Sequence, residues 1–405
     1  MRNWRIIVLT ALTVALLHFS GFWVNPFALT RSGDPDFGQR LDRGLIEHDA
    51  LDEASGIAAS RKNPGVLWMH NDSGDQNRLF TLNSDGRHLG VYFVDGVTSC
   101  DWEDIALGPG PEEGEEYIYI GDIGDNDAAR DVKFIYRVRE PAVHPQQAAI
   151  DTVLAGAETI AFQYPDGKRD AETLMVDPLT RDIYLISKRE NIVHVYRAPY
   201  PQSTANVNTL ESVATLNMTN VVAGDISPSG LEILVKTYTS IFYWCRTAGQ
   251  SIAGALSASP VVVPYVVEPQ GEAISWDFEG AGYFTTSEEL GSVPAHLYYY
   301  PRLNATSVGR VNHLPASFQL QQNYPNPFNP VTNINYSLAT PAHVKLIVYN
   351  VNGRLVDVLV NAEQTAGRYS LELHARGLSS GVYFYRLTLD SLPGSEQVRK
   401  LLVLK

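Results

Sequence analysis

The amino-acid sequence predicts an all-β protein: a five- or six-bladed β-propeller followed by a small immunoglobulin-like β-sandwich, after an N-terminal signal peptide. A short acidic motif recurs five times, with a period of about 50 residues and four predicted strands per period. Short, evenly spaced strands fill about the last 80 residues. The expected domains are a signal peptide 1–28, a propeller 38–303, a linker 304–322 and a C-terminal domain 323–405.

The N-terminal segment has the composition of a secretory signal. Arg2 and Arg5 precede the apolar run 6–17, which matches the charged and apolar regions of a signal peptide. This run is short for a membrane span, which needs roughly 20 apolar residues. We therefore expect export, with an uncleaved anchor or a buried helix as the alternatives.

The repeated motif defines the predicted blades. Its copies are EASGIA at 53–58, DWEDIA at 101–106, DAETLM at 170–175, VAGDIS at 222–227 and QGEAIS at 270–275. Each copy opens a strand and is followed by a second and a third strand, and turn residues separate the strands. The interval between the second and third copies is the longest, so it could contain a sixth blade. The segment RGLIEHDAL before Glu53 is an unpaired fourth strand that could close the ring.

Acidic residues gather at equivalent points of the repeats. Neighbouring strands of a blade are antiparallel, so the start of each first strand and the end of each second strand meet at one end of the propeller. We call this end of the central channel the mouth. The motif starts supply Glu53, Asp101, Trp102, Glu103, Asp104, Asp170, Glu172, Asp225 and Glu272. The ends of the second strands supply Asn71, Asp72, Asp75, Asp122, Asp125, Asn126, Lys188, Arg189, Lys236 and Glu288.

This predicted mouth favours a cation as its ligand. Crowded carboxylates raise one another's pKa, and a hard cation with oxygen ligands relieves their repulsion, so calcium suits the mouth better than zinc. The alternative is that these acids are ordinary turn residues that accept backbone hydrogen bonds. The predicted calcium ligands are Asp104, Asp122, Asp125, Glu172 and Glu272.

Two classes of function are consistent with such a mouth. A surface binding module could recognise a small molecule, glycan or peptide, with Trp102, Tyr238 or Trp276 stacking on sugar rings; the same aromatic residues could instead pack between blades. The alternative is a calcium-dependent hydrolase of anionic esters, in which the cationic side chains at the second-strand ends receive the anion. Neither G-x-S-x-G nor H-E-x-x-H occurs, and His70 is either a general base or a structural residue. A propeller that only spaces other parts is the third possibility.

Composition narrows the choice of partner. The net charge of −14 argues against nucleic acid or an anionic membrane surface. The two cysteines, Cys100 and Cys245, lie far apart in sequence and have no neighbours at zinc-ligand spacing. We therefore expect neither a disulfide framework nor a zinc site, and two small, partly buried side chains instead.

The tail begins with a proline-rich stretch, NYPNPFNP from Asn323, and continues as alternating strands. Asn352-Gly353 predicts a hairpin turn between the strands KLIVYN and RLVDVLV. Together with AGRYSLEL, SGVYFYRL and the closing KLLVLK, these residues resemble the type IX (Por) secretion sorting domain, type A, with its FlgD-like immunoglobulin fold. The resemblance implies passage through the outer membrane of a bacterium by the type IX machinery, then release or attachment at the cell surface. Whether the tail is cleaved stays open.

The repeat region carries a second resemblance. The stretches SGIAASRKNPGVLWMHNDSG, DWEDIALG and YIYIGDIGDN are similar to an exported, uncharacterised bacterial propeller family. More distantly they are similar to calcium-dependent phytase-like and esterase-like propellers. This similarity implies a fold and a possible calcium ion, but no reaction, because one fold hosts many functions.

Overall fold

The structure is a computed structural model. It describes residues 35–289, 291, 294–304, 318–323, 326–338, 340–364, 367–375, 377–389 and 396–404. The predicted signal peptide 1–28 lies outside these residues. Among the described residues, the one α-helix is the short α1 (Ile252–Leu256), and no helix there is long and apolar enough to cross a membrane.

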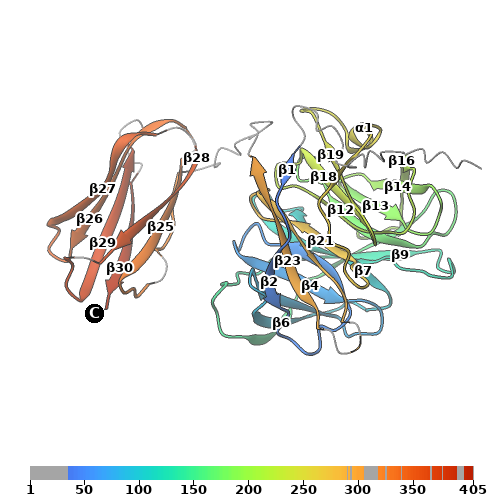
Figure 1. Cartoon of the computed structure of the whole chain (residues 1–405), viewed down its shortest axis with the longest axis horizontal. Helices are drawn as coiled ribbons and strands as arrows, with labels where there is room; N and C mark the ends of the chain where they lie inside the picture. Colours follow the sequence, from blue (N-terminus) through green and yellow to red (C-terminus); the bar gives the residue numbers. More distant parts are fainter. Residues whose placement is uncertain are drawn as a thin grey trace, which may run out of the picture. The chain divides into compact units, whose positions relative to one another are not determined.

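Five sheets form the propeller, one per blade (Figure 1). Blade 1 consists of β3 (Ala54–Ala59), β4 (Val66–Asn71), β5 (Arg78–Asn83), β6 (His88–Val94) and β10 (Ile150–Leu154). Blade 2 consists of β7 (Trp102–Pro109), β8 (Glu116–Asp122), β9 (Lys133–Arg139), β11 (Glu158–Gln163) and β15 (Asn208–Thr209). Blade 3 consists of β12 (Ala171–Val176), β13 (Ile183–Ser187), β14 (Val193–Ala198) and β16 (Glu211–Leu216).

The last two blades complete the ring. Blade 4 consists of β17 (Val221–Ile226), β18 (Glu232–Thr237), β19 (Ile241–Cys245) and β20 (Val261–Val263). Blade 5 consists of β21 (Ala273–Trp276), β22 (Gly282–Thr286), β23 (His296–Asn304), β2 (Leu41–Leu45) and β1 (Asp36–Phe37). The inner strands β3, β7, β12, β17 and β21 contact one another in this order, and β21 contacts β3. The sheets therefore close a five-bladed ring.

The N-terminal strand closes the ring as the sequence predicts. β2 begins two residues before the segment RGLIEHDAL that was expected to be an unpaired strand, includes its first three residues, and pairs antiparallel with β23 in blade 5. β1 pairs with the same strand further along. The final blade therefore contains strands from both ends of the propeller sequence, and this pairing removes an exposed sheet edge.

The long interval between the second and third motifs contains no sixth blade. β10 adds to blade 1 as a parallel outer strand beside β6, and β11 is the antiparallel fourth strand of blade 2. The additional residues of this interval thus widen blade 1. β15, which comes from the later interval between the third and fourth motifs, pairs parallel with β11.

The inner strands are buried on both faces because each lies between two neighbouring blades. All residues of β3 and β12 are buried, which explains why the repeats open with small and aliphatic residues. Large side chains then fill the space between blades: Trp68 and Tyr92 of blade 1 share a core with Trp102 and Tyr136 of blade 2. Trp102 therefore packs between blades, as one of the two alternatives for it predicted.

Polar contacts also join neighbouring blades. The carboxylate of Glu140, fully buried after β9, accepts hydrogen bonds from Ser60 Oγ at 2.5 Å, Trp68 Nε1 at 2.8 Å and Asn63 Nδ2 at 3.1 Å. The guanidinium of Arg246 in blade 4 lies 2.8 Å from a carboxylate oxygen of Asp177 in blade 3. These buried contacts fix how one blade stacks on the next.

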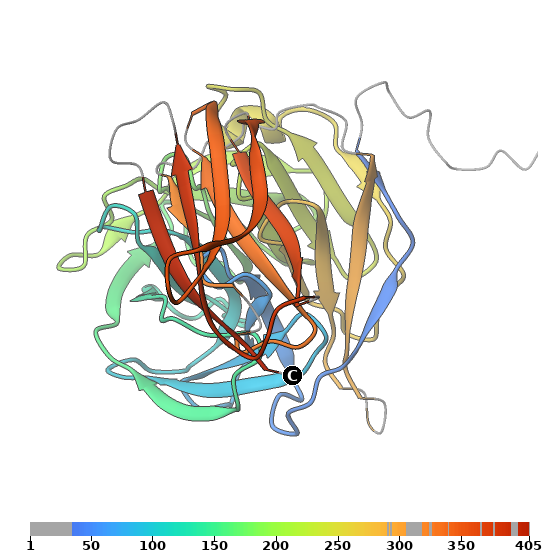
Figure 2. The same cartoon turned by 90° about the vertical axis from the view of Figure 1, so that its left-hand side faces the viewer.

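The tail is a separate two-sheet sandwich (Figures 1 and 2, orange to red). One sheet consists of β24 (Gln319–Leu320), β25 (Val331–Leu338) and β28 (Gly367–His374). The other consists of β27 (Leu355–Gln364), β26 (Ala342–Asn350), β29 (Gly381–Leu389) and β30 (Glu396–Val403). The hairpin between β26 and β27 turns at Gly353, whose φ of 71° favours glycine.

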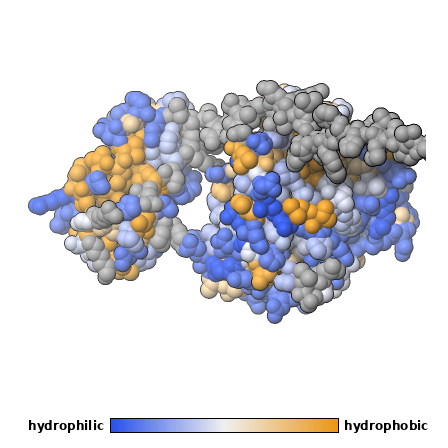
Figure 3. All heavy atoms as spheres, in the orientation of Figure 1, coloured by the Kyte–Doolittle hydropathy of each residue, from blue (hydrophilic) through white to orange (hydrophobic). Residues whose placement is uncertain are grey.

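The sandwich begins earlier in the chain than the sequence predicts. β24 lies in the range expected to be linker, yet it pairs with β25 and its Leu320 is fully buried in the sandwich core. The sandwich therefore begins by Gln319. Hydrophobic surface is visible on this domain (Figure 3). Its exposed large apolar side chains include Leu355, Val358, Phe384 and Val398.

The two cysteines are free and exposed. Cys100 precedes β7 of blade 2 and Cys245 ends β19 of blade 4. The prediction that both are partly buried is wrong, because each lies at a strand end and not in an inter-blade core.

Candidate metal centre

A β-bulge recurs at the same register of the inner strands. Strand pairing skips Ser55 in β3, Glu103 in β7, Glu172 in β12 and Val222 in β17. In blade 5 the matching residue is Glu272, directly before β21. A bulge breaks the alternation of a strand and re-aims the extra side chain. Three of these five positions carry glutamate.

A second set of equivalent residues follows the second strands. The backbone N–H groups of Asp72, Ile123, Lys188 and Glu288 donate to the carbonyls of Glu53, Asp101, Asp170 and Gln270, respectively. These hydrogen bonds, between 2.8 and 3.3 Å long, join each motif start to the end of its second strand. The predicted meeting of the two sets of strand ends at one mouth is therefore present in these blades.

The mouth brings carboxylates from four blades together. Three groups offer one oxygen per residue with all oxygens within 4.8 Å of one another, namely Asp72–Glu272–Glu288, Asp72–Asp101–Glu103 and Glu103–Asp170–Glu172. Asp72 and Glu103 each belong to two groups. The groups therefore adjoin and form one continuous acidic site that spans blades 5, 1, 2 and 3.

One part of this site carries its own cations. Arg189 Nε lies 2.5 Å from Oδ2 of Asp170, and the ammonium of Lys188 donates to Oε1 of Glu172. Both pairs belong to blade 3. The acids of that blade are thus largely neutralised by neighbours in the chain.

The rest of the site is not neutralised. Within the part of the chain that the structure describes, no salt bridge reaches the carboxylates that we call the unpaired set: Asp72, Asp101, Glu103, Glu272 and Glu288. The side chain of Glu103 is only 4% exposed, yet its carboxylate has no hydrogen-bond partner among those residues. Removing such a charge from water without a partner is costly.

The pKa values reflect this crowding. Burial, helped by Glu172, Asp72 and Asp101, raises the pKa of Glu103 well above its usual value. Burial likewise raises the pKa of Glu172 to about 8, because it outweighs the attraction of Lys188. Burial and the charges of Glu272, Asp72 and Glu53 raise the pKa of Glu288 to about 7. The mouth therefore holds these carboxylates in a setting that opposes their ionisation.

Gly124 allows two of these acids to approach the backbone. A Cβ atom at this position would lie 2.6 Å from Oδ2 of Asp101 and would overlap the carboxylate of Glu103. The backbone N–H of Gly124 donates to the carbonyl of Asp101 at 3.2 Å. The loop of blade 2 thus closes tightly over Asp101 and Glu103.

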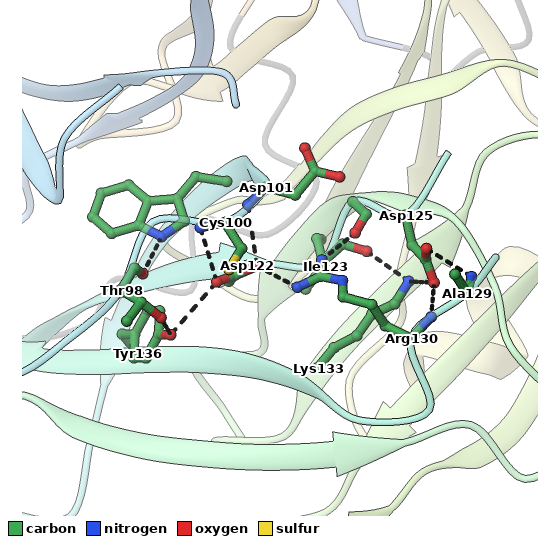
Figure 4. A network of polar contacts seen from close by, with 12 residues as sticks. Thr98, Cys100, Asp101, Asp122, Ile123, Asp125, Ala129, Arg130, Lys133 and Tyr136 are labelled. Carbon is green, nitrogen blue, oxygen red and sulfur yellow. Dashed lines mark hydrogen bonds and ion pairs between the residues drawn. The ribbon is translucent and has the colours of Figure 1, made fainter. Parts of the chain in front are cut away.

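Three predicted calcium ligands, Asp104, Asp122 and Asp125, do not join the groups. Asp104 accepts hydrogen bonds from the backbone N–H groups of Ile105 and Leu174, both 2.9 Å long, inside the interface of blades 2 and 3. Figure 4 shows that Asp122 is paired with Arg130, 2.8 Å away, whereas the carboxylate of Asp101 points away from this network. Asp122 also accepts from the backbone of Cys100 and Asp101.

Asp125 closes its own loop. Its carboxylate accepts from the backbone N–H groups of Ala129 at 2.8 Å and Arg130 at 2.9 Å, and Nζ of Lys133 lies 3.5 Å away (Figure 4). These contacts lower the pKa of Asp125 despite its burial. This acid therefore acts as a turn residue, as the alternative reading of the acidic motifs predicted. Of the predicted ligands, Glu172 and Glu272 lie within the carboxylate groups.

Asp225 lies two residues further along its strand than the position equivalent to Asp104 of blade 2. Strand pairing places Ala223 of blade 4 beside Lys236, as it places Asp104 of blade 2 beside Gly121. Asp225 therefore lies further along its strand, where it accepts from the backbone N–H of Trp276 at 2.8 Å. It lines a small pocket with Arg61, Ser275 and Trp276, and no residue of the carboxylate groups lines this pocket.

The remaining predicted mouth residues have structural partners. Asn71 donates to the carbonyl of Ala50 at 2.7 Å and to Asp75 at 3.1 Å. Lys236 is fully buried and donates to the carbonyls of Thr237 and Gly271. His70, also fully buried, contacts the carbonyl of Asn71 through Nδ1 at 2.7 Å. Glu53 is exposed at the edge of the mouth.

Two residues at the mouth have roles that the sequence analysis missed. Tyr238 donates its hydroxyl to Oε1 of Glu272 at 2.5 Å and is half-buried, so it positions an acid. Gly124 provides the space for Asp101 and Glu103. The glycine in the acidic stretch GDIGDN was the available signal, because glycine is typical of sites where the backbone approaches another group closely.

Comparison with known families identifies the tail. Residues 322–403 match the family described as the secretion system C-terminal sorting domain. The tail is a type IX secretion sorting domain. The protein is therefore exported to the cell surface or the extracellular space, and its sorting domain interacts with the type IX secretion machinery.

Solved structures similar to the chain include one described as a propeller. The Dos1 propeller matches with 7% identity and a TM-score of 0.32, over 65% of this chain and 94% of that one. A fungal alcohol oxidase in complex with copper matches with 9% identity and a TM-score of 0.33, over 86% and 85% of the two chains. At this similarity they carry no argument about function. No curated protein matches the chain significantly.

Proposed function

We propose that the protein is a surface or secreted binding module whose propeller mouth holds a divalent cation, calcium by preference, and recognises a ligand through it. One observation carries the proposal. Asp72 belongs to two carboxylate groups at once, and the unpaired set around it has no salt-bridge partner among the described residues. A bound cation would supply the missing positive charge.

The chemistry of the donors fits calcium. Calcium takes six to eight oxygen ligands at roughly 2.3–2.6 Å, so two ligand oxygens on opposite sides of one ion lie at most about 5 Å apart. The oxygens of each group lie within 4.8 Å of one another. Neither group that contains Asp72 includes a histidine or cysteine, which disfavours zinc.

The charge of the mouth favours an uncharged, hydroxyl-rich ligand such as a glycan. Hydroxyl oxygens can complete the coordination of calcium without adding negative charge to an acidic site. Tyr238 is the half-buried aromatic residue beside Glu272 and is available to a ligand at its exposed edge, whereas Trp102 and Trp276 are buried.

The alternative, a hydrolase of anionic esters, is less well supported. That function needs free cationic side chains to receive the anion. Lys188 is bound to Glu172, Arg189 to Asp170, and Lys236 is buried against backbone carbonyls. None of the three is free to bind an anion in this arrangement.

Calcium titration tests the proposal. Binding to the folded state raises the melting temperature, so calcium should raise it and EDTA should reverse the rise. Asp72→Asn should abolish most of the effect, because Asp72 belongs to both groups. Asp95→Asn is the matched control, since Asp95 is exposed after β6 and outside the groups. A melting temperature insensitive to both calcium and EDTA would remove the cation from the proposal. Binding to a glycan array, with calcium and with EDTA, then tests the ligand class.

A further inference from the structure

The third carboxylate group already holds a cation that belongs to the chain. Glu103, Asp170 and Glu172 offer oxygens within 4.8 Å of one another, and the ammonium of Lys188 donates to Glu172. The side chain of Lys188 is only 9% exposed, and its Nζ lies 5.4 Å from the ring centroid of Tyr238. The ammonium is therefore enclosed within the mouth.

Lys188 occupies a position that carries an acid in other blades. Its backbone N–H donates to the carbonyl of Asp170, as Asp72 does to Glu53 and Glu288 does to Gln270. Blades 1 and 5 thus place a carboxylate where blade 3 places an ammonium. A single side chain reverses the charge at this point of the ring.

Two acids of this group, Glu103 and Glu172, keep ligand atoms without a hydrogen-bond partner among the described residues. Oε2 of Glu172 is buried and has no hydrogen-bond partner, and Glu103, a residue only 4% exposed, makes no side-chain hydrogen bond among the described residues. Asp170 accepts from the backbone N–H of Asp125 at 2.8 Å and from Arg189. A buried carboxylate oxygen without a partner is costly, and a cation between these oxygens would remove that cost.

We infer that the Glu103–Asp170–Glu172 group is a second divalent-cation position, which the ammonium of Lys188 fills in the native chain, so that Lys188 limits the mouth to one divalent cation. The inference rests on the proposed cation beside Asp72. Glu103 is shared by the two positions, so an ammonium and a second ion would compete for the same oxygens and repel each other at short range.

The number of calcium ions bound per chain tests this inference. Isothermal titration calorimetry and equilibrium dialysis with calcium should give one ion for the natural protein and two for Lys188→Met, which keeps an unbranched apolar side chain without the charge. Lys188→Gln should give the same gain and provides a second variant if the first does not fold. Lys62→Met is the matched control. It removes a positive charge from a side chain that is 33% exposed and paired with Glu115, outside the carboxylate groups, and should still bind one ion.

The outcomes separate the inference from the proposed function. Two ions in the natural protein, or one ion or fewer in both Lys188 variants when the natural protein binds one, overturns the inference and leaves the calcium proposal standing. No ion in the natural protein but one in the Lys188 variants overturns the calcium proposal and supports the role of Lys188. No ion in any of these proteins overturns both.

Discussion

Tyr238 of blade 4 donates its hydroxyl to Oε1 of Glu272 of blade 5, at a distance of 2.5 Å. This bond joins two blades at the mouth and fixes one acid of the unpaired set. Tyr238→Phe should lower the free energy of unfolding by about 2 kcal/mol, because a hydrogen bond to a charged group is lost. Urea unfolding measures this change. Tyr117→Phe is the control, because its hydroxyl lies 3.3 Å from the exposed Glu112, and it should have almost no effect.

The mouth should make stability depend on pH. The pKa values of Glu172 and Glu288 are raised from 4.5 to about 8 and about 7, so the folded protein binds more protons than the unfolded chain between these values. The stabilisation that comes from these two raised pKa values is therefore fully present below pH 4.5 and is lost as the pH rises toward 8. Calcium should oppose this loss. We expect the stabilisation by calcium to be larger at pH 8 than at pH 5, as measured by urea unfolding with calcium or EDTA. Equal stabilisation at both pH values would contradict the assignment of Glu288 to the cation site.

Glu140 should contribute to stability without affecting the mouth. Glu140→Ala leaves the buried donors of Ser60, Trp68 and Asn63 without their acceptor, which should cost about 3 kcal/mol. Differential scanning calorimetry should show a lower melting temperature but an unchanged calcium-induced increment. Glu113→Ala, at an exposed turn, should leave the melting temperature where it is. A lost calcium response in Glu140→Ala would link this interface to the mouth.

Gly124→Ala should weaken calcium binding more than it weakens the fold. The added methyl group would overlap the carboxylate of Glu103 and press on Asp101, so both acids must move. We expect the dissociation constant for calcium to rise roughly tenfold, equivalent to about 1.4 kcal/mol. Gly254→Ala, in α1 of blade 4, is the control and should bind calcium normally. Unchanged affinity in Gly124→Ala would show that Asp101 and Glu103 are not ligands.

The sorting domain should be necessary for export and dispensable for calcium binding. Removing residues 322–403 takes away the matched family region and leaves the five blades, whose core clusters do not include the tail. In the producing bacterium, cell fractionation should find the shortened protein in the periplasm. Purified, it should bind calcium with the affinity of the full chain. Surface exposure of the shortened protein would mean that another segment directs its export.

The sequence predicted the propeller well because its strand pattern repeats. The second and third strands are apolar and bounded by turn residues in every blade, and each lies where the pattern indicated. The closing strand was recognised because it had no partner in its own period. The blade number could not be decided from the long interval, because the sequence alone does not show that β10 pairs parallel with a strand of the preceding blade.

The mouth was only partly predictable, and the bulges explain why. Glu103 and Asp104 are adjacent acids of one motif, yet the bulge directs Glu103 to the mouth and Asp104 into the interface between blades. Composition cannot distinguish them, because both side chains have the same chemistry. Asp225 was misplaced for a related reason: blade 4 carries its acid two residues later, and the motif was aligned on charge instead of on strand pairing.

The pairing of β2 with β23 has a consequence for how the chain reaches its final form. A strand from the beginning of the propeller must find one from its end, so the blade that holds the ring shut cannot assemble before residue 304 has been synthesised. Until then the ring is open, and the peptide groups of β2 lack the strand that pairs with them. In this exported protein, the pairing of β2 with β23, which joins the two ends of the propeller sequence, can therefore form only after the whole repeat region has been synthesised.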